Sequence, residues 1–133
     1  LKDEQNLAPT IDVPSPSERI KKEDIFVYDE HVMIKIKNPQ WAVFTDTNSM
    51  DPVIDSTSKA IEIVPQSVED IHVGDIVAYK SEYSESIVAH RIIDTGYDEL
   101  GWYAIIKGDN NSQPDIGKVR FSQIKMVVVA VIY

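Results

Sequence analysis

Three polar segments of the 133-residue sequence contain residue types that hydrolysis requires. The first is segment 47–52 (TNSMDP), in which Ser49 lies between a predicted strand and a proline-initiated turn. A hydroxyl nucleophile must be exposed at a fixed point and close to backbone N–H groups, and this position meets both needs. A serine there can equally serve as a simple cap of the turn. The segment alone therefore leaves both roles open.

The second segment, 87–93 (IVAHRII), has the apolar composition of a strand and contains His90. Imidazole ionises near neutral pH, so it can accept a proton from serine without a large change in its pKa. A lysine in the same role would need its pKa lowered by burial. A lone histidine in a strand is more often structural, so the assignment of a base depends on its partners.

The third segment, 107–115 (KGDNNSQPD), has the composition of a polar turn and carries the carboxylates Asp109 and Asp115. Either carboxylate can orient an imidazole beside a serine. The chain order serine, histidine, aspartate is acceptable because a catalytic triad is defined by its geometry and not by sequence position. The residues by themselves thus indicate a Ser-His-Asp hydrolase with the acid unassigned.

Short strands are expected to position these segments. Alternating apolar and polar residues in 32–36 predict a half-buried strand that forms a hairpin with 26–28. Helix is expected only in short turns, after Met50 and near 67–70. The remaining predicted strands are 41–45, 60–64, 75–80, 87–93, 102–107 and 125–133, separated by turn signals that include Thr95-Gly96. The sequence therefore predicts a mainly β fold, a complex of short β-strands with one or two short helices.

Composition excludes several classes of function. The formal net charge is −9, whereas binding to nucleic acid phosphates requires an excess of Lys and Arg. The absence of Cys rules out disulfides, thiol catalysis and cysteine-based zinc sites. The histidines, His31, His72 and His90, show no metal-ligand spacing. No metal and no cofactor are expected.

The chain divides into two parts at about residue 24. Residues 1–24 are polar and contain three prolines, which predicts a linker or loosely packed arm with a short helix at most in 17–24. Residues 25–133 are expected to form one domain. The longest apolar stretch, 126–133, is rich in Val and too short to span a membrane, so it is expected to be a buried strand.

Taken together, these segments resemble the type I signal peptidase family. Four family motifs occur in the order of the family: 49–52 (SMDP), 73–77 (VGDIV), 90–92 (HRI) and 108–111 (GDNN), the last followed by Asp115. The resemblance covers about residues 44–133. It implies the strand-rich fold that signal peptidases share with repressor-type autoproteases, and it implies a serine protease domain in residues 25–133.

The resemblance also implies a role for each residue. Histidine stands where bacterial members carry a lysine base, as in the archaeal and endoplasmic-reticulum branch. Ser49 would be the nucleophile and His90 the base. Asp115 matches the triad acid, and Asp109 matches a second acid that shapes the site. The hydroxyl of Thr47 and the N–H of Ser49 would form the oxyanion hole.

Family members remove signal peptides from exported proteins by cleavage after small residues. Met50, Val53 and Ile87 would line the shallow substrate pockets, with core packing as the alternative for each. The sequence departs from the family at two positions: Asn48 replaces a small residue, often Gly, and Asp51 replaces Glu. Asn tolerates the left-handed backbone conformation that a tight turn before the nucleophile can require.

The family is anchored by a transmembrane helix that precedes the serine segment. The resemblance therefore implies a catalytic domain on the extracytoplasmic or lumenal face, separated from its anchor, with signal peptides and membrane lipid as partners. Aromatic residues favour the bilayer interface, although packing within the protein is an equal alternative for them. The candidates for bilayer contact are Trp41, Phe44, Trp102 and Tyr103.

Two other functions fit the same segments. One is a catalytically silent domain that binds peptides or partners at a sheet edge. The presence of Ser49, His90, Asp109 and Asp115 argues against loss of catalysis. The other is a repressor-type autoprotease, which uses serine and lysine and usually carries a DNA-binding module. His90 and the acidic net charge argue against this second alternative.

Overall fold

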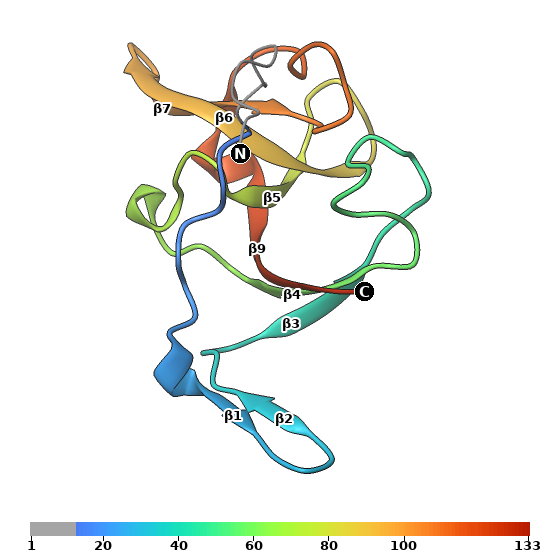
Figure 1. The fold of residues 1–133 in the computed structure, drawn as a ribbon. Coiled ribbons are helices and arrows are strands. Elements are labelled where there is room, and N and C mark those ends of the chain that lie inside the picture. Colours follow the sequence, from blue (N-terminus) through green and yellow to red (C-terminus); the bar gives the residue numbers. More distant parts are fainter. Residues whose placement is uncertain (1–12) are drawn as a thin grey trace, which may run out of the picture.

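Antiparallel strands are the main regular elements of the computed structural model, which describes residues 13–133 (Figure 1). Seven strands form the large sheet, in the order β3-β4-β9-β5-β6-β7-β8, and two more form a separate hairpin. The strands of the large sheet are β3 (Gln40–Val43), β4 (Lys59–Ile63), β5 (Ile76–Lys80), β6 (Ile87–Asp98), β7 (Gly101–Lys107), β8 (Val119–Arg120) and β9 (Ile124–Ile132). Helix is limited to the 3-10 turns η2 (Lys22–Asp24), η3 (Val68–Asp70) and η4 (Phe121–Gln123) in this part of the chain. The predicted mainly β fold is confirmed.

Two apolar clusters pack on opposite sides of the central strands β5 and β9. Neighbouring residues of a strand point to opposite faces of the sheet. Val77 and Val127 belong to the first cluster, together with Ile92 and Ile106, and all four side chains are fully buried. The adjacent residues Ile76 and Val128 belong to the second cluster, whose other members are Met50, Ile54 and Ala60. The second cluster thus fixes the turn that carries Ser49, through Met50.

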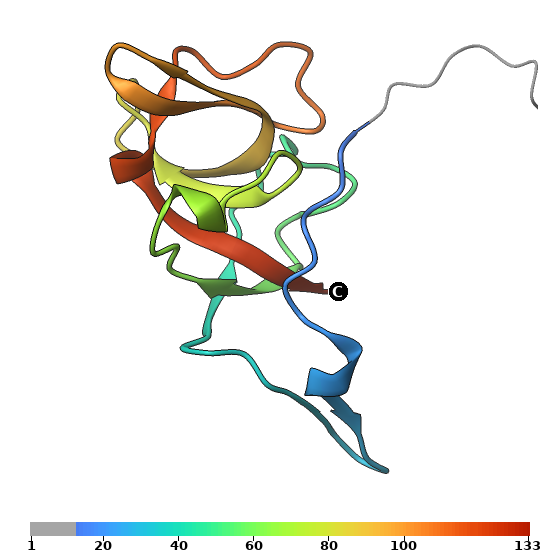
Figure 2. The ribbon, with the colours of Figure 1, turned by 90° about the vertical axis from the view of Figure 1, so that its left-hand side faces the viewer.

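The hairpin of β1 (Ile25–Val27) and β2 (Val32–Ile34) projects away from the large sheet (Figures 1 and 2). The prediction of a hairpin here is confirmed. The prediction that its second strand is half-buried was wrong, because Val32, Met33 and Ile34 are all exposed. Alternation in the sequence predicts which residues share a face of the hairpin, but no other layer of the described structure covers that face.

Thr95 and Gly96 lie within β6, and the prediction of a turn there was wrong. Gly96 lies opposite Tyr103 of β7, and a Cβ atom at Gly96 would be 2.6 Å from the Tyr103 hydroxyl oxygen. The glycine thus permits a close cross-strand approach. The chain reverses five residues later, where Gly101 has a φ of 103°. Strand β8 was not predicted, and residues 51–53 form a turn without a helix.

The described part of the N-terminal arm, residues 13–24, runs along the large sheet and is attached through Asp75 (Figure 2). The fully buried Asp75 carboxylate accepts hydrogen bonds from the backbone N–H and the hydroxyl of Ser17, from Arg19 at 2.7 Å, and from the N–H of His72. Burial opposes ionisation of Asp75, but these donors outweigh it and lower its pKa. The predicted short helix is only the turn η2, and residues 1–12 of the predicted arm lie outside the described residues.

Replacement of Asp75 by asparagine is expected to lower the free energy of unfolding by about 3 kcal/mol at neutral pH, because Arg19 loses its buried partner. The lowered pKa means that Asp75 stabilises the fold fully above about pH 4, which is the ordinary pKa of an aspartate in the unfolded chain. This contribution disappears as the pH falls through the lower pKa of the folded state. The free energy of unfolding, measured in urea across this pH range, should therefore fall less with decreasing pH for Asp75→Asn than for wild type.

The exposed Asp29 at the tip of the hairpin provides the matched control. Its substitution Asp29→Asn removes the same charge without a buried partner and should leave the unfolding curve almost unchanged. Equal stability of Asp75→Asn and wild type at neutral pH would contradict the assignment of Asp75 as the attachment point of the arm.

Candidate active site

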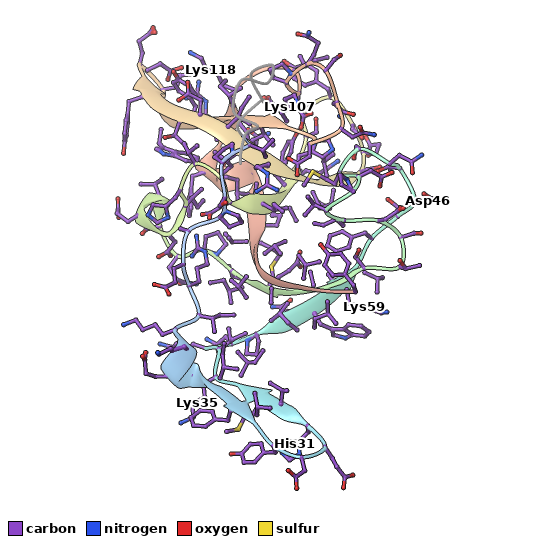
Figure 3. The ribbon with its side chains drawn as sticks, viewed as in Figure 1. His31, Lys35, Asp46, Lys59, Lys107 and Lys118 are labelled. Carbon is purple, nitrogen blue, oxygen red and sulfur yellow. The ribbon has the colours of Figure 1, made fainter. Side chains whose placement is uncertain are left out.

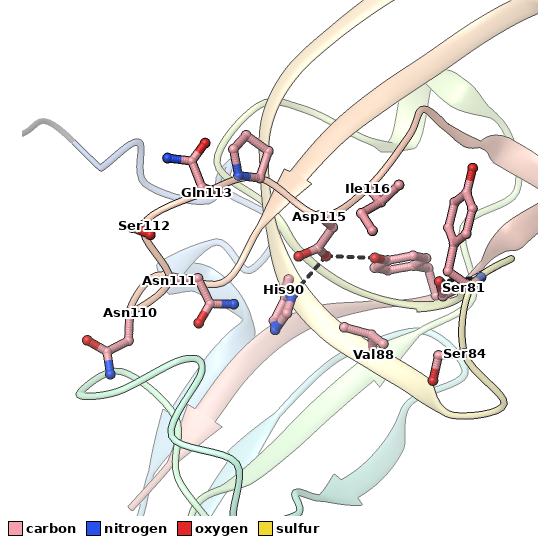
Figure 4. A pocket seen from close by; sticks show the side chains of 13 residues that line it. Ser81, Ser84, Val88, His90, Asn110, Asn111, Ser112, Gln113, Asp115 and Ile116 are labelled. Atoms are coloured by element: carbon pink, nitrogen blue, oxygen red, sulfur yellow. Dashed lines mark hydrogen bonds and ion pairs between the residues drawn. The ribbon is translucent and has the colours of Figure 1, made fainter.

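Ser49, His90 and Asp115 form a continuous line of hydrogen bonds. The Ser49 Oγ lies 2.9 Å from His90 Nε2, and His90 Nδ1 lies 2.8 Å from Asp115 Oδ2. The three residues come from the turn after β3, from β6 and from the loop between β7 and β8. Figure 4 shows His90 directed toward Asp115. This is the geometry in which an imidazole can accept the serine proton while its other nitrogen is held by a carboxylate.

The Ser49 turn is fixed to the loop that follows β7. The Asn110 N–H donates to the Ser49 carbonyl at 2.9 Å, and the Asn110 side-chain amide donates to the Asn48 carbonyl at 3.0 Å. Asn48 has the left-handed backbone, with a φ of 62°, that its residue type tolerates. A Cβ at Gly108 would lie 2.7 Å from the Ser49 carbonyl oxygen and 3.0 Å from His90 Nε2. Glycine at this position therefore allows the two loops to meet beside the imidazole.

Asp115 is positioned from both sides. Its backbone N–H donates to the Ile106 carbonyl at 2.8 Å, and its carboxylate accepts a hydrogen bond of 2.6 Å from the Tyr79 hydroxyl. Burial and the hydrogen bond to Asp115 raise the pKa of Tyr79 well above its ordinary value, so the hydroxyl stays protonated and donates. The sequence analysis did not identify Tyr79. Its signal was a tyrosine in an otherwise apolar strand, which usually needs a partner for its hydroxyl when buried.

Asp109, the alternative acid, is bound to Arg91 and makes no hydrogen bond with His90. The Arg91 Nε and Nη2 donate to the two oxygens of Asp109, each at 2.8 Å. Arg91 Nη1 also donates to the carbonyls of Gly74 and Pro14. The structure thus brings Asp115 rather than Asp109 to the imidazole. Asp109 fastens its loop to Arg91 of β6, and Arg91 in turn holds the N-terminal arm.

The Thr47 hydroxyl lies beside Ser49, as the oxyanion-hole prediction requires. Its Oγ1 is 3.0 Å from the Ser49 Oγ and accepts a hydrogen bond of 3.4 Å from the Ser49 backbone N–H. A hydroxyl can turn to donate to a new acceptor without movement of its oxygen. Thr47 Oγ1 and the Ser49 N–H therefore lie together beside the nucleophile, where the N–H donates to the hydroxyl.

A mainly apolar groove of about 610 Å³ adjoins Ser49 and His90. Met50 and Ile87, two of the predicted substrate contacts, line this groove. Val53, the third, packs against the second apolar cluster and lies outside the groove lining. Ile87 is 55% exposed, whereas Met50 is almost fully buried, so only Ile87 presents a large part of its side chain to a ligand.

A second hollow of about 600 Å³ lies on the Asp115 side of the imidazole (Figure 4). Tyr79, Val88 and His90 line it, together with the polar loop 110–116. His90 thus borders both hollows, whereas Ser49 lines only the apolar groove. The serine is therefore part of the apolar groove and not of the second hollow.

The aromatic residues named as candidates for bilayer contact lie in different environments. Phe44 lines the groove and packs on the second cluster, and Trp102 packs edge-on against Phe121 at 6.4 Å between ring centroids. The Lys118 ammonium lies 4.4 Å above the centroid of the Tyr103 ring. Trp41 is 69% exposed. Contacts within the protein therefore account for Phe44, Trp102 and Tyr103, and Trp41 alone presents most of its ring to the surroundings.

No lysine ammonium among residues 13–133 makes a hydrogen bond with Ser49. Figure 3 shows Lys35 on the hairpin and Lys59, Lys107 and Lys118 spread over the large sheet. Lys107 donates to the Gly108 carbonyl at 3.2 Å, and Lys118 pairs with Asp98 at 3.0 Å. The histidine is therefore the basic group in contact with the serine, in contrast to a serine–lysine pair.

The described residues contain no group of three or more His, Asp or Glu side chains that could hold a metal ion. His31 stacks on Tyr28 of the hairpin, and His72 lies beside Asp75. Neither histidine shares a contact with His90 in the described part of the chain. Within residues 13–133, no helix is long and apolar enough to cross a membrane.

Comparison with models of known protein families gave no match, and comparison with curated proteins gave none either.

Proposed function

We propose that this chain is a serine endopeptidase similar to type I signal peptidases, with Ser49 as nucleophile, His90 as general base and Asp115 as the acid of the triad. The observation that carries the proposal is the hydrogen-bonded line of these three residues at the end of an apolar groove. A serine that only caps a turn does not need an imidazole held in place by a half-buried carboxylate.

The reaction begins when His90 Nε2 takes the proton from Ser49 Oγ as the oxygen attacks the substrate carbonyl carbon. Asp115 accepts a hydrogen bond from Nδ1–H and stabilises the imidazolium that forms. The Ser49 N–H and the Thr47 hydroxyl bind the oxyanion. His90 then gives the proton to the leaving amine, and a water molecule activated by His90 hydrolyses the acyl-enzyme.

The groove supports an extended peptide as substrate. Residues 87–89 of β6 pair with β5, but the pairing of β6 with β7 begins only at Arg91. One edge of residues 87–89 is therefore left without a neighbouring strand in the described structure, and Ile87, Val88 and Ala89 all line the groove. An extended peptide can add to such an edge as a further strand. Its carbonyl groups would then run toward Ser49.

The resemblance to signal peptidases extends the proposal to the substrate and the cellular site. The substrates would be signal peptides of exported preproteins, cleaved after small residues. The domain would act on the extracytoplasmic or lumenal face of a membrane to which it is anchored. The apolar lining of the groove, with Ala42, Ala78 and Ala89 among its residues, agrees with an apolar segment as ligand.

A peptide-cleavage assay tests the proposal. The chain is incubated with detergent or lipid and a peptide that contains an Ala-x-Ala site, and the products are identified by mass spectrometry. Cleavage after the second Ala, lost in Ser49→Ala, is the expected result. Cleavage that persists in Ser49→Ala would exclude Ser49 as the nucleophile.

Replacement of Thr47 by valine is expected to lower kcat by about 10²-fold, with little change in KM, because an oxyanion donor acts mainly in the transition state. Thr47→Ser keeps the hydroxyl and should retain most of the activity. Steady-state kinetics of the two variants separates the contribution of the Thr47 hydroxyl to kcat from that of its methyl group. Equal kcat values for Thr47→Val and Thr47→Ser would remove Thr47 from the oxyanion hole.

A further inference from the structure

Glu62 is a buried carboxylate in the lining of the apolar groove. It lies in β4, its residue is only 6% exposed, and it is one of the residues that line the groove with Ser49. Its side chain makes no hydrogen bond or ion pair with any of residues 13–133. The sequence analysis assigned this residue no role.

The strands around Glu62 supply no cation to the carboxylate. Its cross-strand neighbours are Gln40 of β3 and Val128 of β9. The pairing of β4 with β9 shifts between Ile61 and Glu62 because β9 has an extra residue there, whereas β4 keeps its alternation of buried and less buried residues. The groove has one lysine, Lys125, whose ammonium donates to the Ser122 carbonyl at 3.2 Å. The imidazole of His90 is bonded to Ser49 and Asp115.

The unpaired carboxylate has a cost to folding that an apolar residue would avoid. Burial raises the pKa of Glu62, and no positive charge in the described part of the chain counteracts this effect. Ala60, two residues earlier on the same face of β4, is fully buried in the second cluster and shows that the face accepts apolar side chains. A carboxylate at this point is therefore best explained by a ligand that reaches it through the groove.

We propose that Glu62 forms a subsite of the groove that selects a substrate residue with a positively charged side chain, Lys or Arg. This inference rests on the proposed function, since it names a further feature of the same substrates. A basic side chain has a long apolar stem and a charged end. Its stem matches the apolar walls of the groove, and its charged end would pair with the one carboxylate in the lining.

The test compares matched peptides that carry either Lys or its uncharged analogue norleucine at each position around an Ala-x-Ala site. At one position, wild type should cleave the Lys peptide with a kcat/KM at least about 10-fold above that of the norleucine peptide. In Glu62→Gln this ratio should fall to about one. Glu69→Gln, an exposed residue on η3, is the matched control and should keep the wild-type ratio.

The preference for Lys should also depend on pH in a defined direction. The raised pKa of Glu62 means that the carboxylate becomes neutral at a higher pH than an exposed glutamate. The Lys to norleucine ratio should therefore decline as the pH falls toward the raised pKa. The ratio removes effects that both peptides share, such as protonation of His90. The other titratable side chains of the groove lining are His90 and Lys125.

Thermal unfolding provides an independent readout. Because the pKa of Glu62 is raised on folding, ionisation of the carboxylate destabilises the folded state, and the penalty grows as the pH rises above about 4. Glu62→Gln should therefore have a higher Tm than wild type at neutral pH and an equal Tm in acid. A glutamate with a structural partner would give the opposite result, with a lower Tm for the variant.

Peptide binding to Ser49→Ala separates this inference from the proposed function. Fluorescence anisotropy of the labelled Lys and norleucine peptides measures binding without turnover. Tighter binding of the Lys peptide that is lost in Ser49→Ala/Glu62→Gln supports the subsite even if no peptide is cleaved. Cleavage without a preference for Lys at any position would overturn the subsite and leave the protease intact. Failure of both peptides to bind would overturn the subsite as well.

Discussion

Replacement of Ser49 or His90 by alanine is expected to lower kcat by about 10⁶-fold, and replacement of both should lower it no further. The two side chains are joined by a hydrogen bond of 2.9 Å and act in one proton transfer, so loss of either stops the same step. Pre-steady-state measurement of the acyl-enzyme burst with an activated ester of an Ala-x-Ala peptide should show no burst in any of the three variants.

Matched controls exist for both substitutions. Ser56 is exposed in a nearby turn, and His31 is exposed on the hairpin, so Ser56→Ala and His31→Ala remove the same groups away from the site. Both controls should retain wild-type kcat. A loss in the double variant that equals the product of the two single losses would show that Ser49 and His90 act independently, contrary to the proposed mechanism.

Asp115→Asn is expected to lower kcat by about 10⁴-fold while the protein remains folded. An asparagine amide can donate a hydrogen bond to His90 Nδ1, which then becomes the acceptor. The ring proton moves to Nε2, and this nitrogen can no longer take the proton from Ser49. The imidazole NMR signals of His90 should report the change of tautomer directly.

Asp109→Asn provides the contrast, because Asp109 bonds Arg91 and not the imidazole. This variant should retain the His90 tautomer of wild type and lose stability instead, since the nearly buried Arg91 is left without its charged partner. Equal losses of kcat in folded Asp109→Asn and Asp115→Asn would contradict the assignment of Asp115 as the orienting acid.

The sequence predicts those parts of the site whose residue types are unusual in their local context. A serine before a proline turn and a histidine in an apolar strand stand out because their neighbours do not account for them. The choice between Asp109 and Asp115 could not be made from the residues, because both lie in one polar loop and only the fold shows that Arg91 holds the first. The family resemblance favoured Asp115, and the hydrogen bonds agree with it.

The contributions of Tyr79 and Glu62 could not be predicted because they depend on strands distant in the sequence. Tyr79 meets Asp115 across 36 residues of chain, and Glu62 faces a groove whose walls come from β3, β6 and β9. The exposed hairpin shows that the prediction of the fold from local sequence has the same limit. Period-two alternation predicted its strands, but the layer that would bury one face is a property of the whole chain.

The adjacent residues His90 and Arg91 point to opposite faces of β6, since side chains alternate along a strand. One contacts the serine, and the other holds the arm through the Pro14 carbonyl. The attachment of the arm is therefore a single peptide unit from the imidazole, although the two contacts lie on opposite faces of the strand.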